Sequence, residues 1–74
     1  MVILCGGNIR QCEHYRDRHH FDMSKTRIAT KPEDLYGFIH GTLLIMIGTW
    51  RKNPDSLNVM QAGKRNELAV VEEA

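Results

Sequence analysis

The chain has 74 residues, which is enough for one small domain. Hydrophobic residues make up 42% of the sequence, charged residues make up 26%, and the formal net charge is +1. This balance excludes a disordered polar chain, and it gives no overall electrostatic preference for nucleic acids or membranes.

Residues 1–29 are predicted to form a polar, basic and histidine-rich arm that is partly disordered. Residues 1–5 are apolar and precede the turn sequence at 6–8, so they would form a short strand or a frayed end. Beyond the turn, the apolar residues follow neither the helix period nor the strand period for long. Met23 would serve as an alternative translation start, in which case the first 22 residues would carry little structure.

Cysteine and histidine residues cluster in this arm. Thiolates and imidazoles are ligands that zinc prefers, and a small domain would gain stability from a bound ion. Their spacing matches no established zinc signature, so a solvated histidine-rich stretch is the alternative interpretation. The candidate metal ligands are Cys5, Cys12, His14 and His19.

The arm also contains arginines on both sides of an aromatic residue, Tyr15. Arginine can contact phosphates and an aromatic ring can stack on a base, so Arg10, Arg16 and Arg18 are candidate contacts to nucleic acid. Acidic residues interrupt the run, and no helix-turn-helix pattern accompanies it. A zinc-stabilised nucleic-acid-binding protein is therefore kept as an alternative function.

A helix is predicted over residues 31–52. Thr30 and Glu33 match a capping box, in which each side chain bonds a backbone N–H group at the start of the helix. Pro32 fits the first helical turn, where its missing N–H group costs little. Pro54 would end the helix, because the residue before a proline disfavours the helical conformation.

A second helix is predicted over residues 54–73, with capping signals at its start. The predicted fold class is therefore mainly α. A helical hairpin domain would occupy residues 30–74 and follow the arm at 1–29. An alternative is a small α+β fold with a buried strand over 42–47, where a short apolar run lies between two glycines. Periodicity alone does not separate the two interpretations.

The first predicted helix carries more apolar surface than the second can cover. An uncovered patch of that size usually marks an interface, and a symmetric homodimer closes it with one self-complementary surface. Docking on a larger protein is the alternative. The predicted interface residues are Leu35, Ile39, Leu43, Met46 and Trp50, with Gly37 and Gly41 allowing close helix packing.

These patterns predict a small regulatory or inhibitory protein that acts by protein–protein contact, with no cofactor of its own. Enzymatic activity is not expected, because a chain this short has little room for a pocket of ~300 Å³. The two cysteines and the lack of a signal-like start favour a reducing, cytoplasmic setting. A short single-pass membrane protein is a further alternative, although the uncharged run at 35–50 is shorter than the ~20 residues usually needed.

Overall fold

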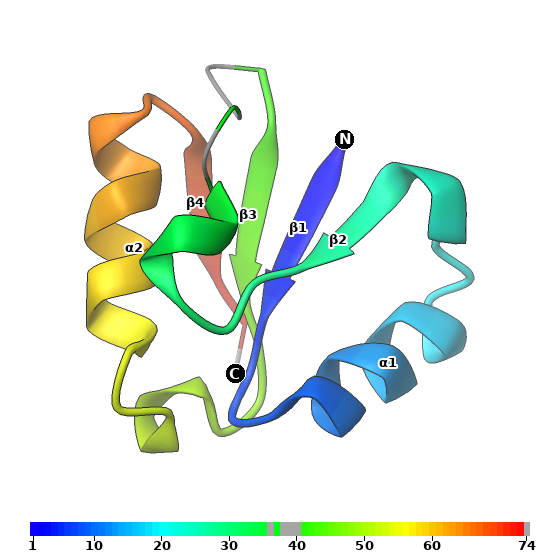
Figure 1. The fold of residues 1–74 in the computed structure, drawn as a ribbon. Helices are drawn as coiled ribbons and strands as arrows, with labels where there is room; N and C mark the ends of the chain where they lie inside the picture. Colours follow the sequence, from blue (N-terminus) through cyan, green and yellow to red (C-terminus); the bar gives the residue numbers. More distant parts are fainter. Residues whose placement is uncertain (36, 38–40, 74) are drawn as a thin grey trace.

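The computed structural model describes residues 1–35, 37 and 41–73 (Figure 1). Within these residues, four strands form one parallel sheet in the order β2-β1-β3-β4. The strands are β1 (Val2–Cys5), β2 (Thr26–Ile28), β3 (Leu43–Met46) and β4 (Ala69–Glu72). The helices are α1 (Ile9–Arg18) and α2 (Ser56–Arg65), with short 3₁₀ turns η1 (Met23–Lys25), η2 (Pro32–Leu35) and η3 (Trp50–Lys52).

The prediction of a mainly α hairpin is wrong, because the protein is an α/β fold built on a parallel sheet. The two central strands, β1 and β3, are apolar along their whole length and largely buried. Central strands of parallel sheets read as continuous hydrophobic runs because helices or loops cover both of their faces. The alternative strand over 42–47 coincides with β3, but the sheet around it is parallel rather than that of an α+β fold.

Residues 1–29, expected to form a polar arm, supply β1, α1 and β2 instead. β1 pairs with β2 on one side and with β3 on the other, so it lies inside the sheet. The first 22 residues are therefore part of the core structure. An ordered strand forms at residues 2–5 because all its side chains find apolar neighbours across the sheet.

The helix predicted over 31–52 is replaced by η2, β3 and η3. Three glycines interrupt the predicted helix. The φ angles of Gly37, Gly41 and Gly48 are 88°, 94° and 54°. Positive φ takes the backbone out of the right-handed helix, and glycine adopts it without steric cost. Gly41 and Gly48 therefore lie on either side of β3, and Gly37 follows the turn η2, so these glycines form no helix–helix contact.

The cap expected at Thr30 and Glu33 is formed by Asp34. The backbone N–H groups of Thr30 and Lys31 donate to Asp34 Oδ2 over 2.9 and 3.3 Å, and the Thr30 hydroxyl donates to the same oxygen over 3.3 Å. This arrangement closes a turn of only four residues, Pro32–Leu35. A local capping signal is thus present, but it starts a 3₁₀ turn.

The second predicted helix is also shorter than expected. α2 ends at Arg65, and Glu67 then adopts a positive φ of 62° before the chain enters β4. Gly63 brings α2 close to the sheet, because a Cβ atom there would lie 2.7 Å from Leu44 Cδ2. The β-branched pair at 70–71 then continues as an edge strand, as such residues favour.

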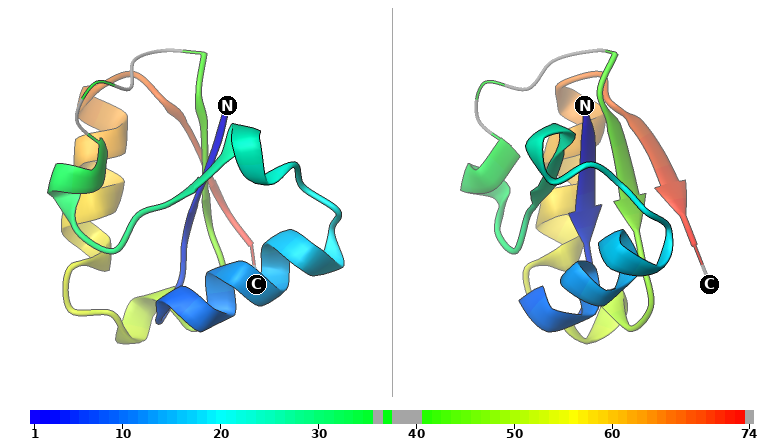
Figure 2. Two further views of the ribbon diagram at one scale, coloured as in Figure 1. Left: turned by 45° about the vertical axis from the view of Figure 1, so that its right-hand side comes forward. Right: turned by 90° about the vertical axis from the view of Figure 1, so that its right-hand side faces the viewer.

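The two helices lie on opposite faces of the sheet (Figure 2). One face packs against α2 and η2 through a core that includes Ile3, Leu44 and Val59. The other packs against α1 through a core that includes Leu4 and Ile45. On the α1 face, the side chains of β4 are exposed. The described elements therefore leave part of this face, beside α1, open to solvent.

Candidate functional site

The strand order places a topological switch point between β1 and β3. From β1 the chain passes through α1 to β2 on one side, and from β3 it passes through α2 to β4 on the other side. The loops at 6–8 and 47–49 therefore diverge at the carboxyl ends of the two central strands (Figure 1). In open α/β sheets, ligands bind in the crevice at this position.

Gln11 joins these two loops. Its side-chain Oε1 accepts hydrogen bonds from the Gly7 N–H over 2.8 Å, the Thr49 N–H over 3.1 Å and the Thr49 hydroxyl over 3.4 Å. Its Nε2 group lies 3.1 Å from Thr49 Oγ1. The backbone N–H of Gln11 donates to Asn8 Oδ1 over 2.8 Å, which caps α1. One amide side chain therefore holds the two switch-point loops together.

Three glycines make room for this amide. A Cβ atom at Gly48 would lie 2.6 Å from Gln11 Cδ, and one at Gly6 would lie 2.9 Å from Gln11 Oε1. A Cβ at Gly7 would collide with the Thr49 hydroxyl. Each distance is shorter than ordinary van der Waals contact, so side chains at these positions would push the loops apart.

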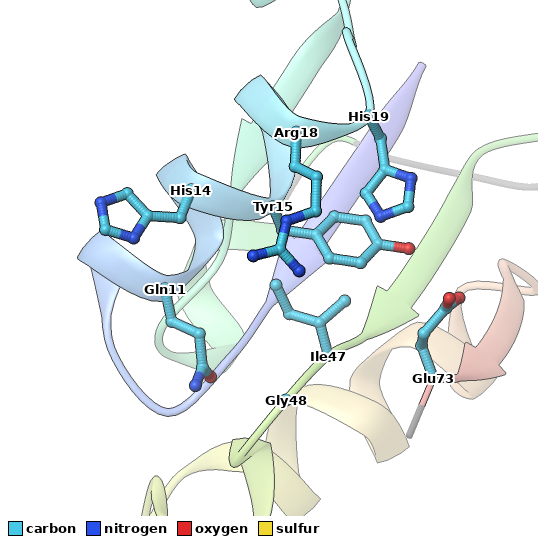
Figure 3. Close-up of a pocket in the computed structure, with 8 residues that line it drawn as sticks. All are labelled: Gln11, His14, Tyr15, Arg18, His19, Ile47, Gly48 and Glu73. Atoms are coloured by element: carbon cyan, nitrogen blue, oxygen red, sulfur yellow. The ribbon is translucent and has the colours of Figure 1, made fainter.

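A cleft of about 420 Å³ lies beside this junction, between α1 and the carboxyl ends of β3 and β4 (Figure 3). The expectation that so short a chain has no room for a pocket is therefore wrong. The cleft forms because α1 covers only part of its face of the sheet. We call it the α1 cleft; it is lined by Gln11, His14, Tyr15, Arg18, His19, Ile47, Gly48 and Glu73.

Aromatic and charged groups share the α1 cleft. The Tyr15 ring lies 4.2 Å from the His19 ring, centroid to centroid, and 6.0 Å from Phe21. Its hydroxyl points toward Glu73, which extends from the end of β4 (Figure 3). Burial, and then the Glu73 carboxylate, raise the pKa of Tyr15, so its hydroxyl stays protonated at neutral pH. Arg18 adds a permanent positive charge beside the ring.

The predicted zinc ligands do not come together. Cys5 and Cys12 are buried on β1 and α1, whereas His14 is exposed on α1 and His19 is exposed just after the end of that helix. In the part of the chain that the structure describes, no group of three or more Cys, His, Asp or Glu side chains could hold a metal ion. The two histidines instead line the α1 cleft.

The two thiols are expected to react slowly in the folded protein. Burial raises the pKa of Cys5 to about 12 and that of Cys12 to about 11. An unfolded thiol titrates near pH 8.5, so the two groups stabilise the fold fully below about pH 8.5, and this contribution is lost as the pH rises through 11–12. We expect labelling by a thiol reagent at pH 8 to speed up strongly in urea, and the free energy of unfolding to fall above pH 9. Labelling at the same rate with and without urea would contradict the burial.

The residues predicted to form an interface are mostly inside the molecule. Leu35 and Met46 are 0% exposed and Trp50 is 3% exposed, while Leu43 is half-buried on the α1 face. These four residues lie on η2, β3 and η3, so they do not form one face of a single helix. Gly37 and Gly41 lie in the connection before β3, and Ile39 lies outside the described residues.

The arginines proposed to contact nucleic acid all lie on α1. With 3.6 residues per turn, positions 10 and 18 lie about 80° apart around the helix axis, whereas position 16 lies about 120° and about 160° from them. Arg16 Nε lies 3.3 Å from Asp17 Oδ1, and its side chain is 15% exposed. Arg18 alone among the three lines the α1 cleft. They form no common stripe that could follow a phosphate backbone.

Sequence reasoning missed Gln11, although a signal for it was present. Asn8 and Gln11 have the spacing of a capping box, and they follow an apolar run and two glycines. That pattern is typical of the turn between a strand and a helix. Thr49 carried no such signal, because its pairing with Gln11 spans 38 positions in the sequence.

No helix in the described ranges is long and apolar enough to cross a membrane. Comparisons of the chain with protein-family models, with curated protein sequences and with solved structures find no match.

Proposed function

We propose that the protein binds a small phosphorylated molecule that carries a ring, of the size of a nucleoside monophosphate, in the α1 cleft. The observation that carries this proposal is a cleft of about 420 Å³ beside the switch point of a parallel sheet. Ligand sites in proteins have volumes of roughly 300–1,000 Å³, and open α/β sheets place them at this point.

The lining of the α1 cleft suits the parts of such a ligand. Tyr15 offers an aromatic surface against which a flat ring can pack, beside the buried side chain of Ile47. Arg18 can form charge-assisted hydrogen bonds with phosphate oxygens. Glu73 can accept hydrogen bonds from hydroxyl or amino groups at the other end.

Binding without catalysis is part of this proposal. The raised pKa of both thiols supports it, since neither Cys5 nor Cys12 would be a thiolate nucleophile at neutral pH. A reducing, cytoplasmic setting is also part of the proposal, because the two thiols are free and buried.

A regulatory role through contact with a second copy or a larger protein stays a prediction. The exposed side chains of Ala69 and Val71 on the open part of the α1 face would be its best surface.

Titration of the ¹⁵N-labelled protein with adenosine monophosphate tests the binding proposal by NMR. We expect the amide signals of Gln11, Tyr15 and Gly48 to move together and saturate. Arg18→Glu should raise the Kd at least about tenfold, since a hydrogen bond to a charged group contributes ~1.5–3 kcal/mol. Arg65→Glu makes the same charge change on α2, across the sheet, and should alter the Kd less than about twofold.

Two outcomes would contradict the proposal. One is that no signal from the α1 cleft moves at millimolar ligand. The other is that Arg18→Glu and Arg65→Glu weaken binding equally, which would indicate attraction by net charge alone. Adenosine and inorganic phosphate, titrated separately, report how much each part of the ligand contributes.

A further inference from the structure

Three hydrogen-bond donors converge on one oxygen at the switch point. They are the Gly7 N–H, the Thr49 N–H and the Thr49 hydroxyl, and all three point at Gln11 Oε1 over 2.8–3.4 Å. We call these three groups the donor cluster. The two N–H groups match the two lone pairs of this neutral amide oxygen, and the Thr49 hydroxyl also accepts from Gln11 Nε2 over 3.1 Å. Convergent N–H groups of this kind are typical of sites for anionic oxygens.

Gln11 links the donor cluster to the α1 cleft, because its side chain bonds Gly7 and Thr49 and also lines the cleft, which Gly7 and Thr49 themselves do not. Gln11 and Gly48 line both the junction and the cleft, so a molecule in the cleft reaches the amide of Gln11 without moving the backbone. Because Gly6, Gly7 and Gly48 carry no side chains, the backbone comes close to the Gln11 amide. Glycines commonly serve this purpose where a backbone must approach a ligand closely.

The Gln11 side chain can leave while α1 stays in place. The capping bond of α1 joins the backbone N–H of Gln11 to Asn8 Oδ1, and it does not involve the amide side chain. Gln11 lies in the first turn of the helix and is only half-buried. Rotation of its side chain toward solvent would therefore expose the donor cluster and leave the helix cap intact.

We propose that the donor cluster is a phosphate subsite and that the Gln11 amide is an internal occupant, which the phosphate group of the ligand displaces. The inference rests on the proposed function, because the phosphate belongs to the molecule bound in the α1 cleft. A phosphate offers several charged acceptor oxygens to the donors that now share one amide oxygen. Arg18, on the same cleft, adds a positive charge to the subsite.

Substitutions at Gln11 separate this role from a direct contact to the ligand. Gln11→Ala empties the donor cluster, so we expect it to lower the Kd for adenosine monophosphate and for inorganic phosphate at least about fivefold. Gln11→Glu has nearly the same shape, and its carboxylate should hold the donors and abolish phosphate binding. Gln61→Ala, the same substitution at an exposed site on α2, should change neither Kd. The readout is the amide signals of Gly7 and Thr49.

The outcomes distinguish this inference from the proposed function. Weaker binding by Gln11→Ala would overturn the inference and make Gln11 a ligand contact. Shifts at Tyr15 with none at Gly7 and Thr49 would also overturn it, while leaving binding in the α1 cleft intact. Phosphate binding at Gly7 and Thr49 without adenosine monophosphate binding would support the subsite and contradict the larger ligand. If Gln11→Ala does not fold, retained phosphate binding by Gln11→Glu would still overturn the inference.

Discussion

Replacing Leu44 by alanine is expected to unfold most of the protein at room temperature. Leu44 is 0% exposed and packs between the sheet and α2, next to Gly63. Truncation of a buried leucine to alanine lowers the free energy of unfolding by about 2–5 kcal/mol. A core of this size rarely supplies more than about 3–5 kcal/mol of net stability, so the loss is comparable to the total. Urea denaturation followed by circular dichroism measures the effect.

Leu57 provides the matched control, because it carries the same side chain with 61% of its surface exposed. Leu57→Ala should change the free energy of unfolding by less than about 0.5 kcal/mol. Leu43, half-buried on the α1 face, should give an intermediate loss. In the helical hairpin predicted from the sequence, Leu43 lies on the buried seam and Leu44 does not. A larger loss for Leu43→Ala than for Leu44→Ala would therefore contradict the sheet.

Gly48→Ala is expected to destabilise the junction of the switch-point loops by about 2–4 kcal/mol. A positive φ costs a non-glycine residue about 1–2 kcal/mol. In addition, the new Cβ would lie 2.6 Å from Gln11 Cδ, so the amide would have to leave Thr49. Each hydrogen bond lost costs about 1 kcal/mol. Thermal unfolding measures the total, and the side-chain amide signals of Gln11 report its displacement.

Gly41→Ala isolates the backbone part of this effect. Gly41 has a φ of 94°, and among the described residues, its chain neighbours apart, no atom lies within 4 Å of the position its Cβ would take. It should therefore lose only the strain of positive φ, about 1–2 kcal/mol. Equal losses for Gly41→Ala and Gly48→Ala would show that crowding of Gln11 contributes nothing to stability.

The sequence indicated the buried strands better than it indicated the fold. A strand at 1–5 was left open beside a frayed end, and a strand at 42–47 was only the alternative to the predicted helix, yet both runs form central strands. The prediction was wrong where it assigned the longer apolar stretch to one helix. Apolar side chains would then lie all around that helix, and other elements would have to bury every side of it. A central strand presents only two faces, and here α1 covers one while α2 and η2 cover the other. Of the described residues in the stretch that suggested a dimer seam, Leu35, Trp50 and the residues at 44–47 are buried by this geometry.

The candidate site was harder to predict because its parts are far apart in the sequence. His14, His19 and Arg18 were singled out as chemically interesting, and all three line the α1 cleft. Ile47 and Glu73 join them only because β3 and β4 are parallel neighbours whose carboxyl ends reach the same edge. Residues that a sheet brings together have no characteristic spacing in the sequence, so their contact could not be predicted. The capping pair Asn8 and Gln11 is three positions apart, and this spacing could be recognised in the sequence.

The central place of β1 has a consequence for how the chain assembles during synthesis. β1 leaves the ribosome before both of its neighbours in the sheet, and it pairs Val2 with Thr26 on one side and with Leu43 on the other. Neither β2 nor β3 can pair with β1 until a much longer stretch of chain has been synthesised. Forming contacts between residues so far apart in the sequence is slow. The apolar side chains of β1 therefore remain uncovered until both neighbouring strands have been synthesised, so contact with a chaperone would protect this segment.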